Sequence, residues 1–263
     1  MRPGTAASRS RPCSRSGARL PAWVDLEGAV NVRDLGGLPL EGGGVTASGV
    51  LIRADNLQDL TPSDVVTLVD ELGVRVVVDL RSHIEVDTEG PGPLTGRVDV
   101  HHRSLYPEKG SFSDVMISRA DGENPFVRYY LGYLRDRPDS FVGAMRDIAS
   151  GPGPVVVHCA AGKDRTGMVV ALTLAAVGVE REAIIADYAL TGERITAIMD
   201  RLRSSDLYRP DLEGITDESR MPRAEYLERV LEVIDAEHGG AASWLAAHGF
   251  DPAPLYKRLV SAA

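Results

Sequence analysis

Hydrophobic residues along the chain recur in two spacings, which predict strands and helices in alternation. The runs 74–80 (VRVVVDL) and 154–158 (PVVVH) are rich in valine, as in strands that are buried on both faces. The stretch 61–73 begins with Thr61 followed by proline and ends at Gly73, which predicts a helix with a capped start and a glycine stop.

The rest of the pattern continues this alternation. Residues 98–105 alternate well enough for a further strand, and Ser82 and Glu85 have the spacing of a capping box at the start of a helical turn. Strands that alternate with helices predict an α/β fold with a mostly parallel central sheet, helices on both faces and extra C-terminal helices. Further helices are predicted at 126–136, 140–150, 166–177, 181–190, 193–204, 222–237 and 241–247, and again near the C-terminus.

The chain divides into a short basic tail and one domain. Residues 1–22 are rich in serine, arginine, glycine and proline, carry five arginines and no acid, and are expected to be disordered. Residues 23–263 are long enough for a single α/β domain with insertions. Within this domain, 107–137 is expected to hold a lid or loop insertion, because its first part has weak periodicity and many turn residues.

Composition narrows the class of protein. A hydrophobic fraction of 43% and a charged fraction of 25% are those of a soluble protein, and no run of about 18 apolar residues predicts a membrane span. Outside the tail, 24 basic residues face 38 acidic ones, a net charge of −14, which argues against a nucleic-acid partner. The sequence lacks a secretory signal, so we expect a cytoplasmic protein, with export by another route and the oligomeric state left open.

The stretch 155–172, VVVHCAAGKDRTGMVVAL, gathers rare residues: it holds one of two cysteines and one of three lysines. It lies where a predicted strand turns into a predicted helix. Such a turn points several backbone N–H groups into one concavity, and the helix dipole makes the concavity an anion site. Ala160, Ala161 and Gly162 are small enough for the backbone to wrap closely, and Gly162 can adopt dihedrals forbidden to other residues.

Cys159, at the floor of this ring, is expected to be an ionised nucleophile, because the same amides and dipole stabilise its thiolate. Arg165 can hold two oxygens of a phosphate in a bidentate fork, and the hydroxyl of Thr166 could donate to the thiolate when it leaves again. These parts suit phosphoryl transfer through a phosphocysteine intermediate, which needs no metal and no cofactor. His101 and His102 lack ligand spacing to another His or Cys, so no metal site is predicted.

The residues HCAAGKDRTG, 158–167, resemble the signature of cysteine-dependent protein-tyrosine phosphatases. The version with Lys-Asp before the arginine is similar to that of an atypical bacterial subgroup that also acts on phosphoinositides. The segments NVRDLGG, LIRADNL, VVVDLRS, AIIADY and RAEYL resemble other landmarks of this subgroup in the same order, so the resemblance covers most of the chain from about residue 23.

This resemblance implies a tyrosine-phosphatase-like fold and hydrolysis of phosphotyrosine, with phosphoserine, phosphothreonine and phosphoinositides as further substrates. The partners it implies are thus phosphorylated proteins or phosphoinositides. It implies Cys159 as nucleophile and Arg165 as phosphate clamp, with Lys163 and Asp164 shaping substrate choice. The ammonium of Lys163 is also expected to provide a second positive charge that binds a multiply phosphorylated headgroup or the leaving-group side of a phosphopeptide. The expected phosphate-binding residues are Ala160, Ala161, Gly162, Lys163, Thr166 and Gly167.

The sequence leaves open which group protonates the leaving oxygen. Asp164 lies in the signature itself, Glu108 and Asp114 lie on the loop after the third strand, and Asp79 ends a strand at the same sheet edge. Each carboxylate also has a structural interpretation. Asp164 would pair with a neighbouring cation, Glu108 and Asp114 would be solvated, and Asp79 would cap a turn. All four remain candidates for the general acid.

Two other functions compete with a phosphatase. A rhodanese-like sulfurtransferase also uses a lone loop cysteine, but the length of this loop and its Arg-Thr-Gly ending disfavour that reaction. A non-catalytic module would hold phosphate on the same loop without hydrolysing it. The joint presence of Cys159, Arg165 and several acid candidates favours an enzyme.

Overall fold

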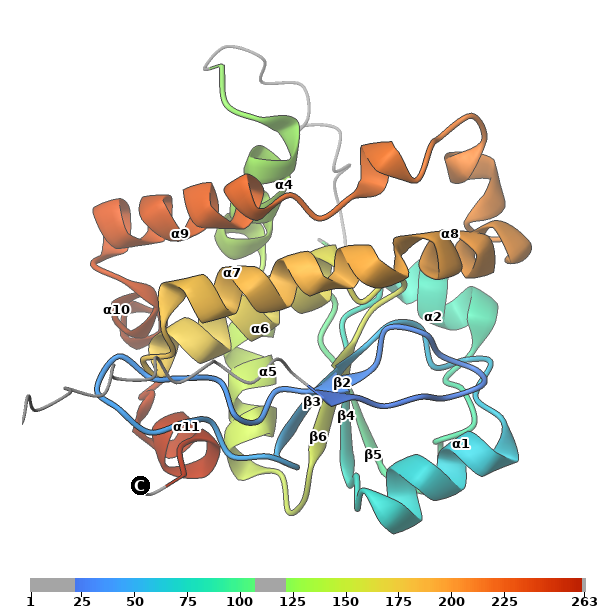
Figure 1. Ribbon diagram of the computed structural model, residues 1–263, viewed down its shortest axis with the longest axis horizontal. Coiled ribbons are helices and arrows are strands. Elements are labelled where there is room, and N and C mark those ends of the chain that lie inside the picture. Colours follow the sequence, from blue (N-terminus) through green and yellow to red (C-terminus); the bar gives the residue numbers. More distant parts are fainter. Residues whose placement is uncertain (1–21, 107–121, 262–263) are drawn as a thin grey trace, which may run out of the picture.

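The computed structural model describes residues 22–106 and 122–261 (Figure 1). Most of the expected basic tail, with Cys13, lies outside the described residues, and so do the two acid candidates Glu108 and Asp114. The first part of the expected lid or insertion, residues 107–121, also lies outside them.

Within the described residues, six strands form one sheet in the order β1-β2-β3-β6-β4-β5. Strands β3, β6, β4 and β5 run parallel, and β1 and β2 extend one edge antiparallel. The predicted mostly parallel sheet is therefore confirmed. The two valine-rich runs form the neighbouring strands β4 and β6, which are buried along their whole length. The bounds are β1 Ala22–Trp23, β2 Arg33–Asp34, β3 Leu51–Ala54, β4 Val76–Asp79, β5 Asp99–His102 and β6 Val155–His158.

The parallel register brings the carboxyl ends of four strands to one edge of the sheet. Ala54 and Asp79 both pair with His158, and Asp79 also pairs with His102. Each of these residues is the last of its strand. Ligands of open α/β sheets bind outside this edge, so the loops that follow these strands are where a site is expected.

Helices cover both faces of the sheet. On one face lie α1 (Pro62–Val66) and a single π-helical turn, η1 (Thr67–Glu71). On the other face, α5 (Pro138–Ser150) contacts β4, and α6 (Asp164–Ala176) contacts β3 and β6. The first face buries Val65, Leu68, Ile52, Val77 and Val156. The second buries Phe141, Met145, Val76, Val78, Val155 and Val157.

Local signals in the sequence set the starts of two helices. Thr61 caps α1 and Ser82 caps α2 (His83–Glu89), each through a capping box that Asp64 or Glu85 completes. The capping box expected from Ser82 and Glu85 is thus confirmed. The helix expected over 61–73 changes to π geometry after α1, so only its first part is an α-helix.

The chain after α6 supplies the expected extra helices. α7 and α8 run in line, and α9 lies above them beside α4, which forms from residues of the expected lid or insertion (Figure 1). None of the described helices is long and apolar enough to cross a membrane. The remaining bounds are α4 Pro125–Asp136, α7 Arg181–Leu190, η2 Thr191–Arg194, α8 Ile195–Ser204, η3 Arg209–Leu212, η4 Glu218–Arg220, α9 Ala224–His238, α10 Ala241–Ala247 and α11 Ala253–Leu259.

Candidate active site

Within the stretch 155–172, a tight loop joins β6 to α6. β6 ends at His158 and α6 begins at Asp164, so residues 159–163 make the whole turn. Gly162 has φ +64°, and a Cβ there would lie 2.6 Å from the carbonyl oxygen of Ala54. Both the left-handed backbone and the close approach require glycine, as the sequence predicted.

Cys159 lies at the floor of a large pocket above this loop. Its exposed fraction is only 2%, and the pocket has a volume of about 790 Å³. Helix α2 and the loop form one side, α4 brings aromatic rings, and α8 with the following segment 207–220 closes the other side. The apolar and aromatic lining comprises Ile84, Tyr106, Phe126, Tyr129, Tyr133, Ile195, Ile198, Met199, Leu202, Leu207, Tyr208 and Leu212.

Arg165 is held in a fork by Glu85. Its Nη1 and Nη2 donate to the two carboxylate oxygens of Glu85 at 2.6 and 2.8 Å, and its guanidinium lies over the ring of Tyr106 at 4.9 Å from the centroid. Burial alone would raise the pKa of Glu85. The charge of Arg165, its hydrogen bonds and those from Ser82 outweigh burial and lower this pKa to about 2. Glu85 is therefore ionised at neutral pH and fixes one edge of the guanidinium.

Glu85 is a functional residue that sequence reasoning missed. The sequence gave it a role only in the capping box, which the structure also shows: Oε2 accepts the N–H of Ser82 at 2.7 Å. Its partner Arg165 lies 80 positions along the chain, so local spacing could not join the two. The capping-box spacing to Ser82 was the one signal at Glu85, and it indicates a helix start and not a contact with Arg165.

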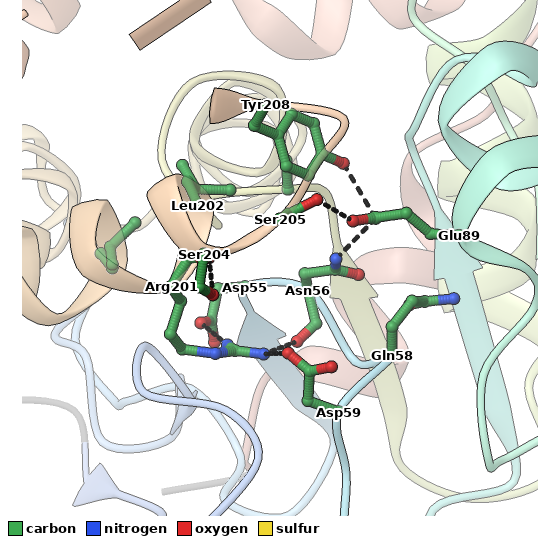
Figure 2. Close-up of a pocket in the computed structure, with 12 residues that line it drawn as sticks. Asp55, Asn56, Gln58, Asp59, Glu89, Arg201, Leu202, Ser204, Ser205 and Tyr208 are labelled. Atoms are coloured by element: carbon green, nitrogen blue, oxygen red, sulfur yellow. Dashed lines mark hydrogen bonds and ion pairs between the residues drawn. The ribbon is translucent and has the colours of Figure 1, made fainter. Parts of the chain in front are cut away.

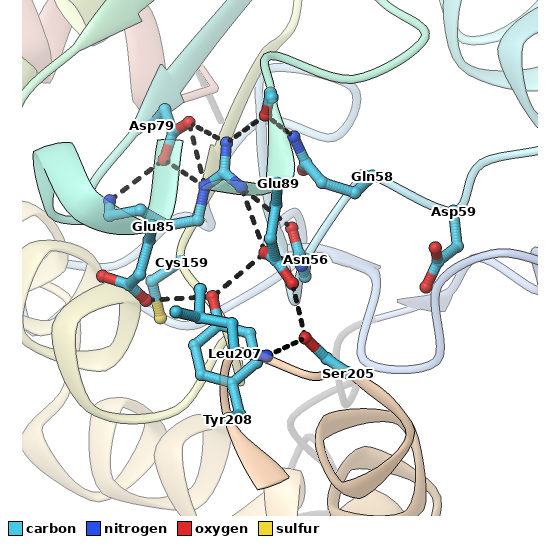
Figure 3. A network of polar contacts seen from close by, with 12 residues as sticks. Asn56, Gln58, Asp59, Asp79, Glu85, Glu89, Cys159, Ser205, Leu207 and Tyr208 are labelled. Carbon is cyan, nitrogen blue, oxygen red and sulfur yellow. Dashed lines mark hydrogen bonds and ion pairs between the residues drawn. The ribbon is translucent and has the colours of Figure 1, made fainter. Parts of the chain in front are cut away.

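A network of hydrogen bonds links α2 to the segment after α8 across the pocket. The hydroxyl of Tyr208 donates to Glu85 and to Glu89, each at 3.1 Å, and Ser205 donates to Glu89 at 2.9 Å. Figure 3 shows these side chains converging beside Cys159. The segment that carries Tyr208 is thereby tied to the same carboxylate that holds Arg165.

Asp79 is engaged with Arg81 below the loop. The Arg81 guanidinium donates to both oxygens of Asp79 at 2.6 to 3.1 Å. Burial would raise the pKa of Asp79, but neighbouring His158 and the Arg81 bonds outweigh it and hold this pKa well below its usual range. Burial lowers the pKa of His158, so its ring is neutral at pH 7. Asp79 thus holds no proton to donate at neutral pH.

The two unusual loop residues, Lys163 and Asp164, line the pocket and contact its other walls. Lys163 Nζ donates to the carbonyl of Arg220 at 2.7 Å and lies 3.6 Å from Asp164 Oδ2. Asp164 Oδ1 accepts the hydroxyl hydrogen of Tyr130 at 2.5 Å. Lys163 is 4% exposed, so its ammonium is largely engaged by the protein. Of the acid candidates among the described residues, Asp164 is the one that lines the same pocket as Cys159.

Thr166 and Gly167 occupy the first turn of α6. The Thr166 hydroxyl is fully buried and has no hydrogen-bond partner among the described residues; its donation to the Cys159 thiolate when this leaves phosphorus stays a prediction. Gly167 packs against the Tyr188 ring, which a Cβ would approach to 3.0 Å. In the described part of the chain no group of His, Cys, Asp and Glu is arranged to hold a metal ion.

A smaller polar pocket of about 310 Å³ adjoins the first and shares four lining residues with it, Ala160, Ile198, Leu202 and Tyr208. Figure 2 shows Arg201 reaching between Asp55 and Asp59. Asn56 donates to Glu89 at 2.8 Å on the opposite wall. These internal bonds fasten the end of α8 to the loop after β3.

Comparisons with known proteins agree with this geometry. A family model described as tyrosine phosphatase family matches residues 24–259. The triple specificity protein phosphatase PtpB of Mycobacterium tuberculosis is 30% identical over 88% of this chain and 95% of its own. A tyrosine-protein phosphatase of Nostoc commune is 29% identical over 75% of this chain and 69% of its own.

Among solved structures, P. aeruginosa TpbA in complex with pTyr aligns with a TM-score of 0.37 and 18% identity, over 66% of this chain and 80% of that chain. The family match spans nearly all of the described residues, including the cysteine loop and Glu85. The chain therefore belongs to the tyrosine phosphatase family.

Proposed function

We propose that this phosphatase hydrolyses phosphate monoesters through a phosphocysteine formed on Cys159. The observation that carries the proposal is the joint placement, in one pocket, of a buried cysteine and an arginine held in a fork by Glu85. Together they match a phosphate with one covalent partner and several donors.

The reaction has two displacements at phosphorus. In the first, the Cys159 thiolate forms an S–P bond, the P–O bond to the alcohol or phenol breaks, and the leaving oxygen takes up a proton. In the second, a water oxygen attacks phosphorus, loses a proton and displaces the thiolate, which releases inorganic phosphate. The loop amides and Arg165 stabilise the charge of the equatorial oxygens in both steps.

Arg165 can serve both Glu85 and the phosphate. A guanidinium has five N–H donors, and Glu85 uses one on Nη1 and one on Nη2. The edge formed by Nε and the second hydrogen of Nη2 is left for a bidentate phosphate contact. Glu85 therefore acts as a positioning residue that aims this edge into the pocket.

We assign proton transfer to Asp164. It lines the pocket with Cys159, whereas Asp79 is ionised and engaged with Arg81. Asp164→Asn should slow hydrolysis of a phenyl phosphate with a poor leaving group by about 100-fold or more and change that of p-nitrophenyl phosphate far less. Equal effects on both substrates would transfer the role to Glu108 or Asp114, and the same comparison on Glu108→Gln and Asp114→Asn would identify it.

The pocket walls favour an aromatic leaving group. Phe126, Tyr129 and Tyr133 line it from α4, and aromatic faces stack well on a phenyl ring. We propose phosphotyrosine in proteins as the preferred substrate, with phosphoserine, phosphothreonine and phosphoinositides as alternatives, in keeping with the triple specificity in the name of PtpB. A panel of these phosphates at matched concentration tests the order of preference.

Catalysis itself is tested on p-nitrophenyl phosphate. The wild-type chain should release p-nitrophenol, and Cys159→Ser should abolish release although its fold is kept. Activity retained in Cys159→Ser would exclude the phosphocysteine path, and no activity in the wild type would favour a non-catalytic phosphate-binding module. Turnover of thiosulfate instead of phosphate esters would favour a sulfurtransferase.

A further inference from the structure

The carbonyl groups in and beside the cysteine loop, residues 159–163, accept hydrogen bonds from the protein. His158 O accepts from Leu80 N at 2.9 Å, Ala160 O from Asn56 N at 3.0 Å and Lys163 O from Gly167 N at 2.9 Å. Between these backbone bonds, the carbonyls of Ala161 and Gly162 are held by side chains instead. The carbonyls of Ala160, Ala161 and Gly162 are therefore each bonded to a segment outside the loop.

Two buried side chains supply those bonds. Asn31 Nδ2 donates to Ala161 O at 3.0 Å and to Gly162 O at 3.3 Å. Arg53 Nη2 donates to Gly162 O at 2.6 Å. Asn31 and Arg53 have an exposed fraction of 0% and lie more than a hundred positions before the loop, so they contact it only through the tertiary fold.

These bonds determine where the loop amides point. In a planar trans peptide the C=O of one residue and the N–H of the next lie on opposite sides of the chain. When the carbonyls of Ala161 and Gly162 point outward to Asn31 and Arg53, the N–H groups of Gly162 and Lys163 point inward. Asn31 and Arg53 therefore aim the donors that a bound phosphate would meet.

An ion cluster fixes both side chains in turn. Arg33 donates to Asn31 Oδ1 at 2.6 Å and to Asp187 Oδ1 at 2.8 Å, and Arg53 donates to Asp187 Oδ2 at 2.5 Å. Burial would raise the pKa of Asp187, but the two arginines outweigh it and lower this pKa. Burial and the charge of Arg53 lower the pKa of Arg33 to about 10, which still leaves its guanidinium charged at neutral pH.

The cluster carries one net positive charge behind the loop. Two guanidinium groups share the carboxylate of Asp187, and all three side chains are at most 1% exposed, while Glu193 acts on Arg33 only through its charge. A buried charge is screened far less than a surface charge. The cluster therefore favours an anion in the loop, whether thiolate or phosphate, in addition to the inward amides.

We propose that Asn31 and Arg53, fixed by Arg33 and Asp187, are positioning residues that hold the cysteine loop in its phosphate-binding shape and place a positive charge behind it. The proposal rests on the proposed function, in which this loop binds the phosphate. Asn31 and Arg33 lie in the segment NVRDLGG, Arg53 lies in LIRADNL and Asp187 lies in AIIADY.

The test compares Asn31→Ala and Arg53→Met with Thr46→Val. Thr46 is a matched control, because it is also buried and its hydroxyl also bonds two backbone groups, Leu35 O and Leu38 N, away from the cysteine loop. We expect Asn31→Ala and Arg53→Met to lower kcat/KM on p-nitrophenyl phosphate by about 10- to 100-fold, and to weaken inhibition by orthovanadate by a similar factor. Thr46→Val should change neither by more than about twofold, although all three variants lose stability.

The rates of two alkylating reagents at Cys159 distinguish a loss of positive potential in the loop from a general loss of structure. Iodoacetate is an anion and iodoacetamide is neutral, so the ratio of their rates at Cys159 reports the potential in the loop. Arg53→Met should lower this ratio severalfold, whereas Arg53→Lys, which keeps the charge, should restore most of it. If Arg53→Met does not fold, Asn31→Ala still decides the question through vanadate inhibition.

The result that would overturn the proposal is a folded Asn31→Ala and Arg53→Met pair with wild-type kcat/KM and vanadate inhibition. Failure of the proposed function looks different, since the wild type itself would then not hydrolyse p-nitrophenyl phosphate. In that case protection of Cys159 from iodoacetamide by inorganic phosphate would still measure binding to the loop. Protection unchanged in Asn31→Ala would count against the positioning role.

Discussion

Glu85 is the residue through which the fold most directly controls Arg165, and Glu85→Gln tests that control. The substitution keeps the shape of the side chain but turns one carboxylate oxygen into an NH₂ group that would face a guanidinium donor. The two bonds of 2.6 and 2.8 Å cannot both persist. Arg165 then loses its fixed orientation, and its phosphate-binding edge is no longer aimed into the pocket.

The size of the effect on stability follows from the titration of Glu85. Its pKa falls from the ordinary 4.5 to about 2, and at about 1.4 kcal/mol per unit the ionised form contributes roughly 3 kcal/mol to the free energy of unfolding. The side chains of Arg165 and Glu85 are 9% and 10% exposed, so solvent screens the pair little. Because the folded pKa is depressed, this contribution is present above pH 4.5 and is lost as the pH falls toward 2.

Urea unfolding and steady-state kinetics measure both consequences. At pH 7, Glu85→Gln should unfold with a free energy about 3 kcal/mol smaller than the wild type, and the difference should shrink as the pH approaches 2. Its kcat/KM on p-nitrophenyl phosphate should fall by about 100-fold. The control Asp235→Asn removes a carboxylate paired with Arg181 at the surface, where Asp235 is 50% exposed, and should cost less than about 1 kcal/mol. Wild-type stability and wild-type vanadate inhibition in Glu85→Gln would refute the reasoning.

Two further substitutions test the loop and the wall opposite Glu85. Gly162→Ala places a Cβ 2.6 Å from Ala54 O at a φ of +64°, so we expect kcat/KM to drop by at least about 100-fold. The control Gly178→Ala, at φ +81° with open space around it, should leave kcat/KM unchanged. Equal losses of kcat/KM in the two variants would contradict the packing argument. Tyr208→Phe removes the donor to Glu85 and Glu89. We expect it to lower the free energy of unfolding by about 1 kcal/mol and to raise KM severalfold. An unchanged urea midpoint and an unchanged KM would show that these bonds contribute neither to stability nor to substrate binding.

The parts of the site that the sequence predicted are those with local causes. Gly162 could be assigned to a tight turn because a strand must become a helix within a few residues there. Ser82 and Glu85 could be assigned to a helix start because the capping box spans three residues. The strands β4 and β6 could be predicted from runs of valine, because a strand that is buried on both faces has no polar side.

The parts that the sequence did not predict depend on contacts between distant segments. Nothing near Glu85 indicates that it meets Arg165, and nothing near Asn31 indicates that its amide holds the carbonyls of Ala161 and Gly162. Spacing along the chain predicts neighbours only within one helix or strand. Lys163 shows the same limit, since its bond to the carbonyl of Arg220 depends on how the segment after α8 returns over the loop.

The central claim is that Cys159 carries the phosphate during turnover, and trapping that intermediate tests it most directly. Wild-type protein is mixed with p-nitrophenyl phosphate, quenched in acid within one turnover, digested and analysed by mass spectrometry. The account predicts that the peptide containing Cys159 gains the mass of one phosphoryl group, and that the gain is absent in Cys159→Ser. Continued hydrolysis with no phosphoryl group on this peptide, or with the group on another residue, would contradict the account.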